Sequence, residues 1–519
     1  MKQDILIGVD AGTSVIKAVA FDLTGRQIAM ASRRNSYNTL PNGGVEQNMR
    51  RTWTDTAAVL RALGDQVEGL SGRTLALSVT GQGDGCWLID AAGAPVHDGW
   101  LWLDARAAEE ARHIAASDGI DTIYRTTGAG VNVCQMRTHL TWIKRHEPDL
   151  LERAATALHC KDWLYFNLTG ERASDPTEGV FTFGDYRTRD YSDAVLAALD
   201  LADLRRLLPP IVDGAVTAHP LTAAAAEATG LAAGLPVTLA YVDIMCSAMG
   251  AGLHDDAVCP GLTVLGSTGM HMRFVPSAEA VVLNDDRCGY TMAFPGGAYA
   301  QMQTNMAATL NIDWVLGLAR DVLAAEGVAR DLGDLLKGLD DRVMAARPGA
   351  ALYHPYISSA GERGPFAEPA ARASFTGLDQ TTGWFDMIRA VYDGLALAAR
   401  DCYTAMGPMP GEIRLTGGAA RSASLKSIFA SALNTPLRTV AQEEAGAAGA
   451  VMIAAVQQGL YPDMAACSKA WVTPLLQQAE DPDPQMTATY DALYEAYAAT
   501  RQALAPAWTT MSSARGALA

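Results

Sequence analysis

Short apolar stretches joined by Gly/Thr turns occur twice in this chain, about half of its 519 residues apart. The segment from Ile5 to Asp22 reads as strand, acidic glycine turn and strand, and the segment from Gly261 to Phe274 repeats this pattern. Thr13 occupies the first turn and Thr268 the second. Because the spacing is close to half the chain, we predict an internal duplication that produced two domains of similar plan. A coincidence of two common turns is the alternative.

The rest of the chain shows the alternation of strand and helix patterns typical of an α/β protein. We expect strands at residues 74–80, 86–90 and 413–416, and a strand, acidic turn and small-residue helix between 235 and 252. Further helices are expected at residues 105–116, 138–146, 161–168, 305–318, 382–406, 425–433, 443–455 and 487–504, with a Pro/Gly-rich loop at 353–369. We place the crossover between the halves at 235–252, which gives domains at residues 1–250 and 251–519.

Length and composition narrow the classes of function. A chain of this length exceeds one hydrophobic core, and its 49% hydrophobic and 19% charged residues are ordinary for a soluble protein. The net charge of −17 disfavours nucleic acid and anionic membranes as partners. The eight cysteines form no CxxC pair, and neither a signal peptide nor a membrane-spanning apolar run is evident, so we expect a reduced, cytoplasmic protein.

The first turn has the composition of an anion-binding site. Gly8 and Gly12 let the backbone approach a phosphate closely, and N–H groups in such a turn form an anion-binding nest. Asp10 would repel a bare phosphate, so its presence indicates a divalent cation between carboxylate and nucleotide. An ordinary β-hairpin with a glycine turn is the alternative for this segment alone.

Two other glycine clusters differ in context. The run from Gly81 to Gly85 mimics a dinucleotide fingerprint but continues as a strand, whereas a Rossmann turn opens a helix. Gly417 and Gly418 follow a strand and precede a helix, which predicts a site for phosphate or for the ribose and adenine edge of a nucleotide.

Seven motifs occur together, in one order and over nearly the whole chain: Asp10-Ala-Gly-Thr13, Trp102-Leu-Asp-Ala-Arg106, Asp162 with Leu168-Thr-Gly170, Asp243, Gly266-Ser-Thr-Gly269, Gly361-Glu-Arg363 and Gly417-Gly418. In this order they resemble the FGGY carbohydrate kinase family. The resemblance implies two actin-like (ribonuclease H-like) domains, each a mixed sheet flanked by helices, with a cleft between them. It also implies ATP, Mg²⁺ and a sugar or polyol as ligands, with phosphate and acceptor bound by the first domain and nucleotide by the second.

The resemblance assigns roles to individual residues. Asp243 matches the catalytic acid that takes the proton from the attacking hydroxyl, and Asp10 matches the metal-linked acid. The expected ATP contacts are Gly12, Thr13, Ser14, Lys17, Gly266, Thr268, Gly417, Gly418 and Ser422. A helix N-cap is the alternative for Asp243, and a solvated strand residue is the alternative for Lys17.

Short polar side chains around one aromatic wall suit a polyhydroxylated acceptor. The expected acceptor contacts are Gln82, Asp84, Trp102, Asp104, Asn132, Cys134 and Asp243. A core role for Trp102 and a structural ion pair between Asp104 and Arg106 are the alternatives.

The chain departs from the commonest family pattern at the acceptor site. Gly83 and Cys134 stand where glycerol kinases carry an arginine and a tyrosine, and Ile244 replaces a frequent glutamine, so glycerol is a poor candidate. Motifs such as Thr-Gly-Gln-Gly-Asp-Gly and Gly-Ser-Thr-Gly-Met-His-Met most closely resemble the family members that phosphorylate a terminal hydroxyl of erythritol. A ketopentose such as L-xylulose is the alternative acceptor.

Two other classes of protein stay open as alternatives. They are a noncatalytic sugar-binding protein on the same scaffold and an NAD-linked polyol dehydrogenase. The expected partners are a small polyol or sugar and ATP, without nucleic acid or membrane, and the sequence is compatible with a homodimer.

Overall fold

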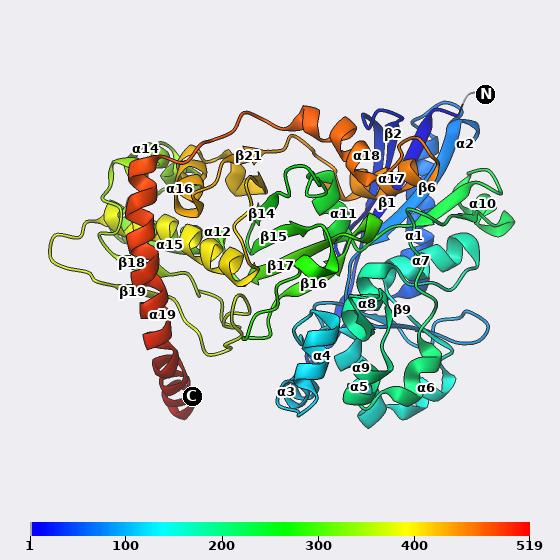
Figure 1. The fold of residues 1–519 in the computed structure, drawn as a ribbon, viewed down its shortest axis with the longest axis horizontal. Coiled ribbons are helices and arrows are strands. Elements are labelled where there is room, and N and C mark those ends of the chain that lie inside the picture. The colour runs from blue at the N-terminus through cyan, green and yellow to red at the C-terminus, as the bar shows by residue number, and fades with distance from the viewer. Residues whose placement is uncertain (1–2, 519) are drawn as a thin grey trace.

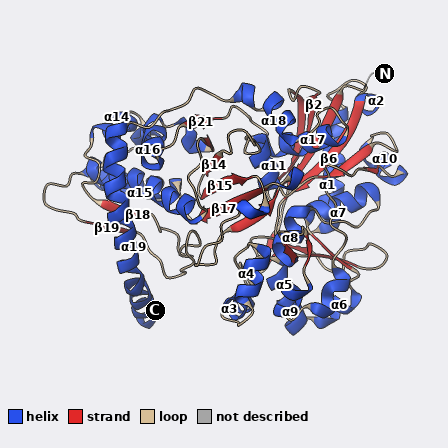
Figure 2. Cartoon of the chain, in the orientation of Figure 1, coloured by secondary structure: helices blue, strands red, loops and turns tan. Residues whose placement is uncertain are grey.

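The computed structural model describes residues 3–518, which form two lobes, each built around a six-stranded sheet (Figures 1 and 2). The first sheet contains β1 (Ile5–Ala11), β2 (Val15–Asp22), β3 (Gln27–Arg34), β6 (Thr74–Gly81), β12 (His219–Pro220) and β13 (Pro236–Leu239). The second contains β14 (Gly261–Leu265), β15 (Gly269–Val275), β16 (Tyr290–Ala293), β17 (Tyr299–Asn305), β20 (Ile413–Thr416) and β21 (Leu437–Thr439).

The two sheets share one topology. In the first sheet, the order β3-β2-β1-β6-β13 has antiparallel pairs up to β1 and parallel pairs from β1 to β13. The order β17-β15-β14-β20-β21 in the second sheet has the same sequence of pair types. The first sheet adds β12 beside β13, and the second adds β16 beside β17. This repetition confirms the two-domain, actin-like plan and supports the predicted duplication.

Alternation along β1 gives the first sheet two buried faces. Ile5, Ile7 and Val9 pack in one core with α1 (Met49–Gly64), α7 (Cys160–Thr169) and α10 (Ala223–Thr229). Leu6 points to the opposite face, which is covered by α11 (Asp243–Gly250) and α17 (Ala445–Gln457). Since β1 is buried on both sides, the sheet provides a rigid base for the turns at its edge.

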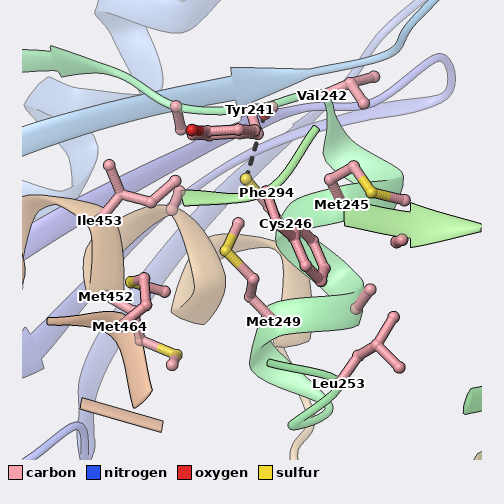
Figure 3. Close-up of a cluster of buried hydrophobic side chains, with 14 of the residues drawn as sticks. Tyr241, Val242, Met245, Cys246, Met249, Leu253, Phe294, Met452, Ile453 and Met464 are labelled. Atoms are coloured by element: carbon pink, nitrogen blue, oxygen red, sulfur yellow. Dashed lines mark hydrogen bonds between the residues drawn. The ribbon is translucent and has the colours of Figure 1, made fainter. Parts of the chain in front are cut away.

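Helices α11 and α17 also join the two lobes. Their core includes apolar residues of the second sheet such as Leu262 and Met272. Figure 3 shows Cys246 and Met249 of α11 close to Met452 and Ile453 of α17. Although α17 belongs to the second half of the sequence, it packs on the first sheet, beside β1 and β2 in Figure 1. A single hydrophobic core therefore spans both halves at this point.

The second sheet is covered on its other face by α12 (Thr309–Ala325), α15 (Trp384–Ala405) and α16 (Ala423–Leu433). Beyond them lie α13 (Leu332–Leu336), α14 (Leu339–Ala345), β18 (Leu352–His354), β19 (Ser374–Thr376) and the terminal helix α19 (Pro484–Leu518). In contrast, α18 (Met464–Trp471) packs against α17 in the core that joins the two lobes.

Insertions in the first half form a smaller layer below the first sheet in Figure 1. They comprise β4 (Asn38–Thr39), β5 (Val45–Gln47), β7 (Trp87–Ile89), β8 (Gly99–Trp100), α3 (Ala108–Ala115), α4 (Ile120–Thr127), α5 (Met136–His146), α6 (Pro148–Arg153), β9 (Thr156–Leu158), α8 (Pro176–Phe183), β10 (Gly184–Asp185), β11 (Asp190–Tyr191) and α9 (Asp193–Ala198). Most of these elements pack around a separate apolar core. The short helix α2 (Leu70–Arg73) lies at the other end of the sheet, directly before β6.

Most expected elements occur, with shifted ends. The strand at 413–416 is confirmed at both ends, and α7 ends at Gly170 in the left-handed conformation. The helix expected from residue 305 is wrong at its start, because Asn305 is the last residue of β17 and the helix begins at Thr309. Helix α19 is longer than expected and buries Tyr490, Tyr497 and Trp508, so it is more than a surface helix.

Two further findings bear on the expectations from composition. All eight cysteines are free, and seven of them are buried. Within residues 3–518, no helix is both long and apolar enough to cross a membrane.

Candidate functional site

Polar residues collect where three neighbouring parallel strands of the first sheet end. Asp10 is the penultimate residue of β1, which leads into the turn at Thr13. The parallel neighbour β6 continues into Gln82 and Asp84, and the next strand, β13, leads to Asp243. Thr80 Oγ1 donates to the carbonyl of Tyr241 at 2.6 Å and holds the ends of β6 and β13 together. The carboxyl ends of parallel strands are where open α/β sheets bind ligands.

Asp243 is the first residue of α11, and its carboxylate is held against the helix end. The backbone N–H of Ile244 donates to Asp243 Oδ1 at 2.6 Å. Burial raises the pKa of Asp243 to about 8, and the nearby Asp10 carboxylate adds to this rise. The helix N-cap is Val242, so the alternative that Asp243 merely caps the helix is wrong. A carboxylate with such a pKa is suited to accept a proton near neutral pH.

Asp10 lies beside the first turn of α17. A Cβ at Gly446 would lie 2.6 Å from Asp10 Oδ2, so only glycine fits next to this carboxylate. Burial raises the pKa of Asp10 to about 6, while Lys17 opposes and Glu444 adds to the rise. Asp10 and Asp243 are both partly exposed, and the Asp10 carboxylate contributes to the raised pKa of Asp243.

This donor set fits Mg²⁺ that is bound mainly through phosphate oxygens and water. Among residues 3–518, no cluster of three or more His, Cys, Asp or Glu side chains could hold a metal ion. Mg²⁺ commonly uses only one or two protein carboxylates and completes its shell with water and substrate phosphates. Asp10 provides one such carboxylate.

A chain of hydrogen bonds links the first turn to the aromatic wall. Thr13 Oγ1 donates to Gln82 Oε1 at 2.8 Å and accepts from Trp102 Nε1 at 2.8 Å. Gln82 Nε2 in turn donates to Gln47 Oε1 at 2.7 Å. Trp102 is 43% exposed, so the alternative that it is a core residue is wrong. Gln82 is buried with both ends of its amide paired, and it supports Thr13 and Gln47.

The other acceptor residues lie along one wall that includes the second lobe. Cys134 Sγ donates to Asp84 Oδ2 at 3.4 Å, while the buried Asp84 Oδ1 has no hydrogen-bond partner. Burial raises the pKa of Asp84, and Cys134 opposes this rise through its hydrogen bond. Asn132 Nδ2 donates to the hydroxyl of Tyr290, which belongs to β16. An acceptor hydroxyl would satisfy the free oxygen of Asp84.

The expectation that Asp104 contacts the acceptor is wrong. Asp104 is fully buried, accepts from the backbone N–H of Val45 and pairs with Arg106 at 2.8 Å. The Arg106 guanidinium also stacks 3.7 Å from the ring centre of Trp100. The structural ion pair, the alternative drawn from the sequence, is therefore the role that the structure supports.

The corresponding edge of the second sheet is more open. Gly266 lies at the end of β14, Thr268 is exposed in its turn, and Thr309 Oγ1 donates to the Gly266 carbonyl at 2.8 Å. Gly417 has φ of 96°, and a Cβ there would lie 2.4 Å from the Leu265 carbonyl. Gly418 is exposed with free space where a Cβ would stand. The second turn and the glycine pair thus lie at one edge, with room for a ligand.

Two residues expected to contact ATP have protein partners. Lys17 Nζ forms an ion pair with Glu444 at 2.7 Å. Ser422 is the N-cap of α16 and donates to Asp340 Oδ1 at 2.7 Å. Ser14 and Gly12 lie in the first turn as expected, where Asn35 donates its side-chain amide to the Gly12 carbonyl. Lys17 thus contacts the start of α17 and Ser422 caps α16, while their ATP contacts stay predictions.

Sequence reasoning missed several residues of the site. Glu178 accepts from the backbone N–H of Asp84 at 2.9 Å, and Tyr290 reaches Asn132 from the other lobe. Glu362 of the Gly361-Glu-Arg363 motif accepts from the backbone N–H groups of Met306 and Arg363. The contacts of Glu178 and Tyr290 join residues far apart in the chain, and no local pattern marks them.

Comparisons with known proteins cover both halves. The model of the FGGY family of carbohydrate kinases, N-terminal domain, matches residues 5–250, and that of the C-terminal domain of the same family matches residues 261–458. These two matches extend over more than half of the chain.

Individual relatives match along their whole length. The chain is 51% identical over 515 residues to erythritol kinase from Brucella abortus (strain 2308), covering 99% of each chain, and 28% identical over 509 residues to xylulose kinase from Escherichia coli (strain K12), covering 96% and 99%. Among solved structures, xylulose kinase from Rhodospirillum rubrum superposes with a TM-score of 0.85 at 26% identity, covering 97% of this chain and all of the other. Gluconate kinase from Lactobacillus acidophilus superposes with a TM-score of 0.87 at 21% identity, covering 98% and 99%, which supports the fold alone.

Proposed function

The chain belongs to the FGGY family of carbohydrate kinases, and from this premise we propose that it transfers the γ-phosphoryl group of ATP to a terminal hydroxyl of erythritol. The acceptor is taken from the relative named erythritol kinase, to which the chain is 51% identical over nearly its whole length. The observation that carries the chemistry is the partly exposed Asp243 at the start of α11, beside the end of β13, with a pKa raised to about 8.

In this proposal, Asp243 accepts the proton of the attacking hydroxyl. The acceptor oxygen forms a bond to the γ-phosphorus while the bond from that phosphorus to the bridging oxygen breaks, and ADP leaves. Such transfer depends mainly on in-line positioning and on charge stabilisation. The first turn at Thr13 and the second at Thr268 are assigned to the phosphates, and Gly417 and Gly418 to the nucleoside. The tight packing of α11 against α17 keeps Asp243 in place.

Asp10 is assigned to Mg²⁺, as the fit of its carboxylate and the absence of a larger acidic cluster in residues 3–518 suggest. When bound, Mg²⁺ neutralises charge on the phosphate oxygens. Asp10 would then hold the cation, and Gly446 leaves room for the Asp10 carboxylate beside α17.

The acceptor site favours a short polyol in this account. Trp102 provides an exposed aromatic wall, and Asp84 has a free buried oxygen for a hydroxyl. Asn132 and Cys134 complete the polar side. A ketopentose such as L-xylulose is the second candidate, because xylulose kinases are among the relatives, at lower identity.

We place the enzyme in the cytoplasm, because it uses ATP and its eight cysteines are all free. The homodimer stays a prediction from the sequence. Light scattering on the purified protein would measure its molar mass in solution and so test this prediction.

The test is a coupled ADP assay with purified protein, Mg²⁺ and ATP against polyols and ketoses of three to six carbons. We expect the highest kcat/KM with erythritol. A preference for L-xylulose would support the second candidate, and ADP release that no polyol or sugar stimulates would refute the proposed function. Omitting Mg²⁺ should abolish turnover.

A further inference from the structure

A buried group of charged side chains lies directly behind the acceptor wall. It joins α7 and α8 and contains no residue that the reaction itself needs. Its members are His159, Lys161, Asp162, Asp175 and Glu178, each at most 3% exposed. Burying so many charges is costly unless each is paired, so their retention calls for a specific role.

The group forms a continuous series of contacts. Lys161 Nζ lies 2.6 Å from Asp175 Oδ1 and 2.8 Å from Asp162 Oδ1. Asp162 Oδ2 lies 3.2 Å from His159 Nδ1, and Asp175 caps α8 through the backbone N–H of Thr177. The two helices are thereby locked together at their N-terminal ends.

The series ends on the acceptor side at Glu178. Its Oε2 lies 3.2 Å from His159 Nε2, within ion-pair range but without the alignment of a hydrogen bond. Its Oε1 accepts from the backbone N–H of Asp84 at 2.9 Å. Asp84 has φ of 53°, in the left-handed region that is unfavourable for a residue with a side chain. The contact with Glu178 helps to hold Asp84 in this conformation.

Glu178 also shapes the turn before Asp84. A Cβ at Gly83 would lie 2.5 Å from Glu178 Oε1 and 2.4 Å from Val242 Cγ2. Glu178 therefore occupies space that a larger residue at position 83 would need. Val242 directly precedes Asp243. The Glu178 carboxylate therefore contacts the turn that carries Asp84 and also lies beside the segment that carries Asp243.

The pKa shifts of Glu178 and His159 indicate that these two side chains form an ion pair. Burial raises the pKa of Glu178 to about 7, while His159 opposes the rise. Burial lowers the pKa of His159, but Glu178 and Asp162 outweigh it and the net shift is upward. Each partner thus favours the charged form of the other.

We propose that Glu178, supported by His159, is a positioning residue that sets the Asp84 carboxylate for the polyol acceptor. The inference rests on the proposed kinase function. Glu178 does not touch the acceptor; it acts through the backbone of Asp84. Its loss should therefore lower kcat/KM for the acceptor selectively, because a displacement of about 1 Å in a positioning group can cost about 100-fold in rate.

The test compares Glu178→Ala, Glu178→Gln and Glu178→Asp in the coupled ADP assay. We expect Glu178→Ala to raise KM for erythritol at least about 10-fold while KM for ATP changes less than about 2-fold. Glu178→Gln keeps an oxygen that accepts from Asp84 N–H, so it should recover most of the affinity. Glu178→Asp withdraws that oxygen and should resemble Glu178→Ala.

Asp55→Ala is the matched control. Asp55 is a buried carboxylate paired with the exposed Arg33 and Arg51, so its loss also removes a buried, ion-paired carboxylate, but it lies on α1 and is not assigned to the acceptor. It should lower the melting temperature without changing KM for erythritol. If Glu178→Ala does not fold, Glu178→Gln and Glu178→Asp decide the question.

Two outcomes are distinguishable. An unchanged KM for erythritol in folded Glu178→Asp and Glu178→Ala, or equal rises in the two KM values, would overturn the positioning role. A wild-type protein that phosphorylates no polyol or sugar would instead overturn the proposed function.

Discussion

Asp243 is subject to two opposing demands. It must be ionised to accept a proton, yet burial and the neighbouring Asp10 both favour its protonated form. The hydrogen bond that Asp243 accepts from the backbone N–H of Ile244 favours the ionised form. The balance leaves a carboxylate far more basic than an exposed one, which is an advantage for a base that works near neutral pH.

This balance predicts the pH dependence of the reaction. At saturating Mg²⁺ and ATP, kcat/KM for erythritol should fall as the pH decreases, because protonated Asp243 cannot accept a proton. The apparent pKa should lie at or below about 8, since a cation beside Asp10 favours the ionised form, and well above the ordinary 3.8. Steady-state rates between about pH 5 and pH 9 test this, with circular dichroism to verify folding. A flat profile over that range would contradict the assignment.

At the scale of elements, the contact between α11 and α17 determines where the base stands. A Cβ at Gly449 of α17 would lie 1.9 Å from the carbonyl oxygen of Cys246 on α11. The clash would involve the backbone of α11, so no side chain could move away to remove it. A helix rich in Ala and Gly is recognisable from sequence, but which helix it packs against is decided by tertiary structure.

Gly449→Ala should therefore separate the two helices. We expect a loss of about 1–3 kcal/mol in the free energy of unfolding, typical of overpacking, together with a lower kcat. Urea unfolding and steady-state rates measure both. Gly317→Ala on α12 is the control, because a Cβ there meets nothing within 4 Å and should stabilise the helix by up to about 1 kcal/mol. Equal stability in the two variants would show that the close contact is unimportant.

For the whole molecule, the two turns at Thr13 and Thr268, together with the strand and helix patterns between them, led to the prediction of a duplicated α/β plan, because glycine turns between apolar strands are local patterns. The sheet order confirms this plan. The packing of α17, a helix of the second half, on the first sheet could not be predicted. It depends on contacts between residues more than 400 positions apart, such as Lys17 and Glu444.

For the site, as for the fold, the sequence predicted the residues that local patterns mark but not the contacts between distant segments. Asp10, Asp84 and Asp243 could be placed at strand ends from sequence, and the structure gathers them there. Asp104 was assigned to the acceptor because its burial, which decides for the ion pair with Arg106, is not visible in a local motif. Tyr290 and Glu178 were missed because they reach the acceptor wall from distant segments.

The most direct measurement compares wild-type protein with Asp243→Asn. Asparagine has nearly the same shape but cannot accept the proton, so we expect erythritol-dependent ADP release to fall at least about 100-fold. Calorimetric titration with ATP should give nearly the same affinity for both proteins. Full turnover in Asp243→Asn would contradict the account, because the proton of the acceptor would then be taken elsewhere.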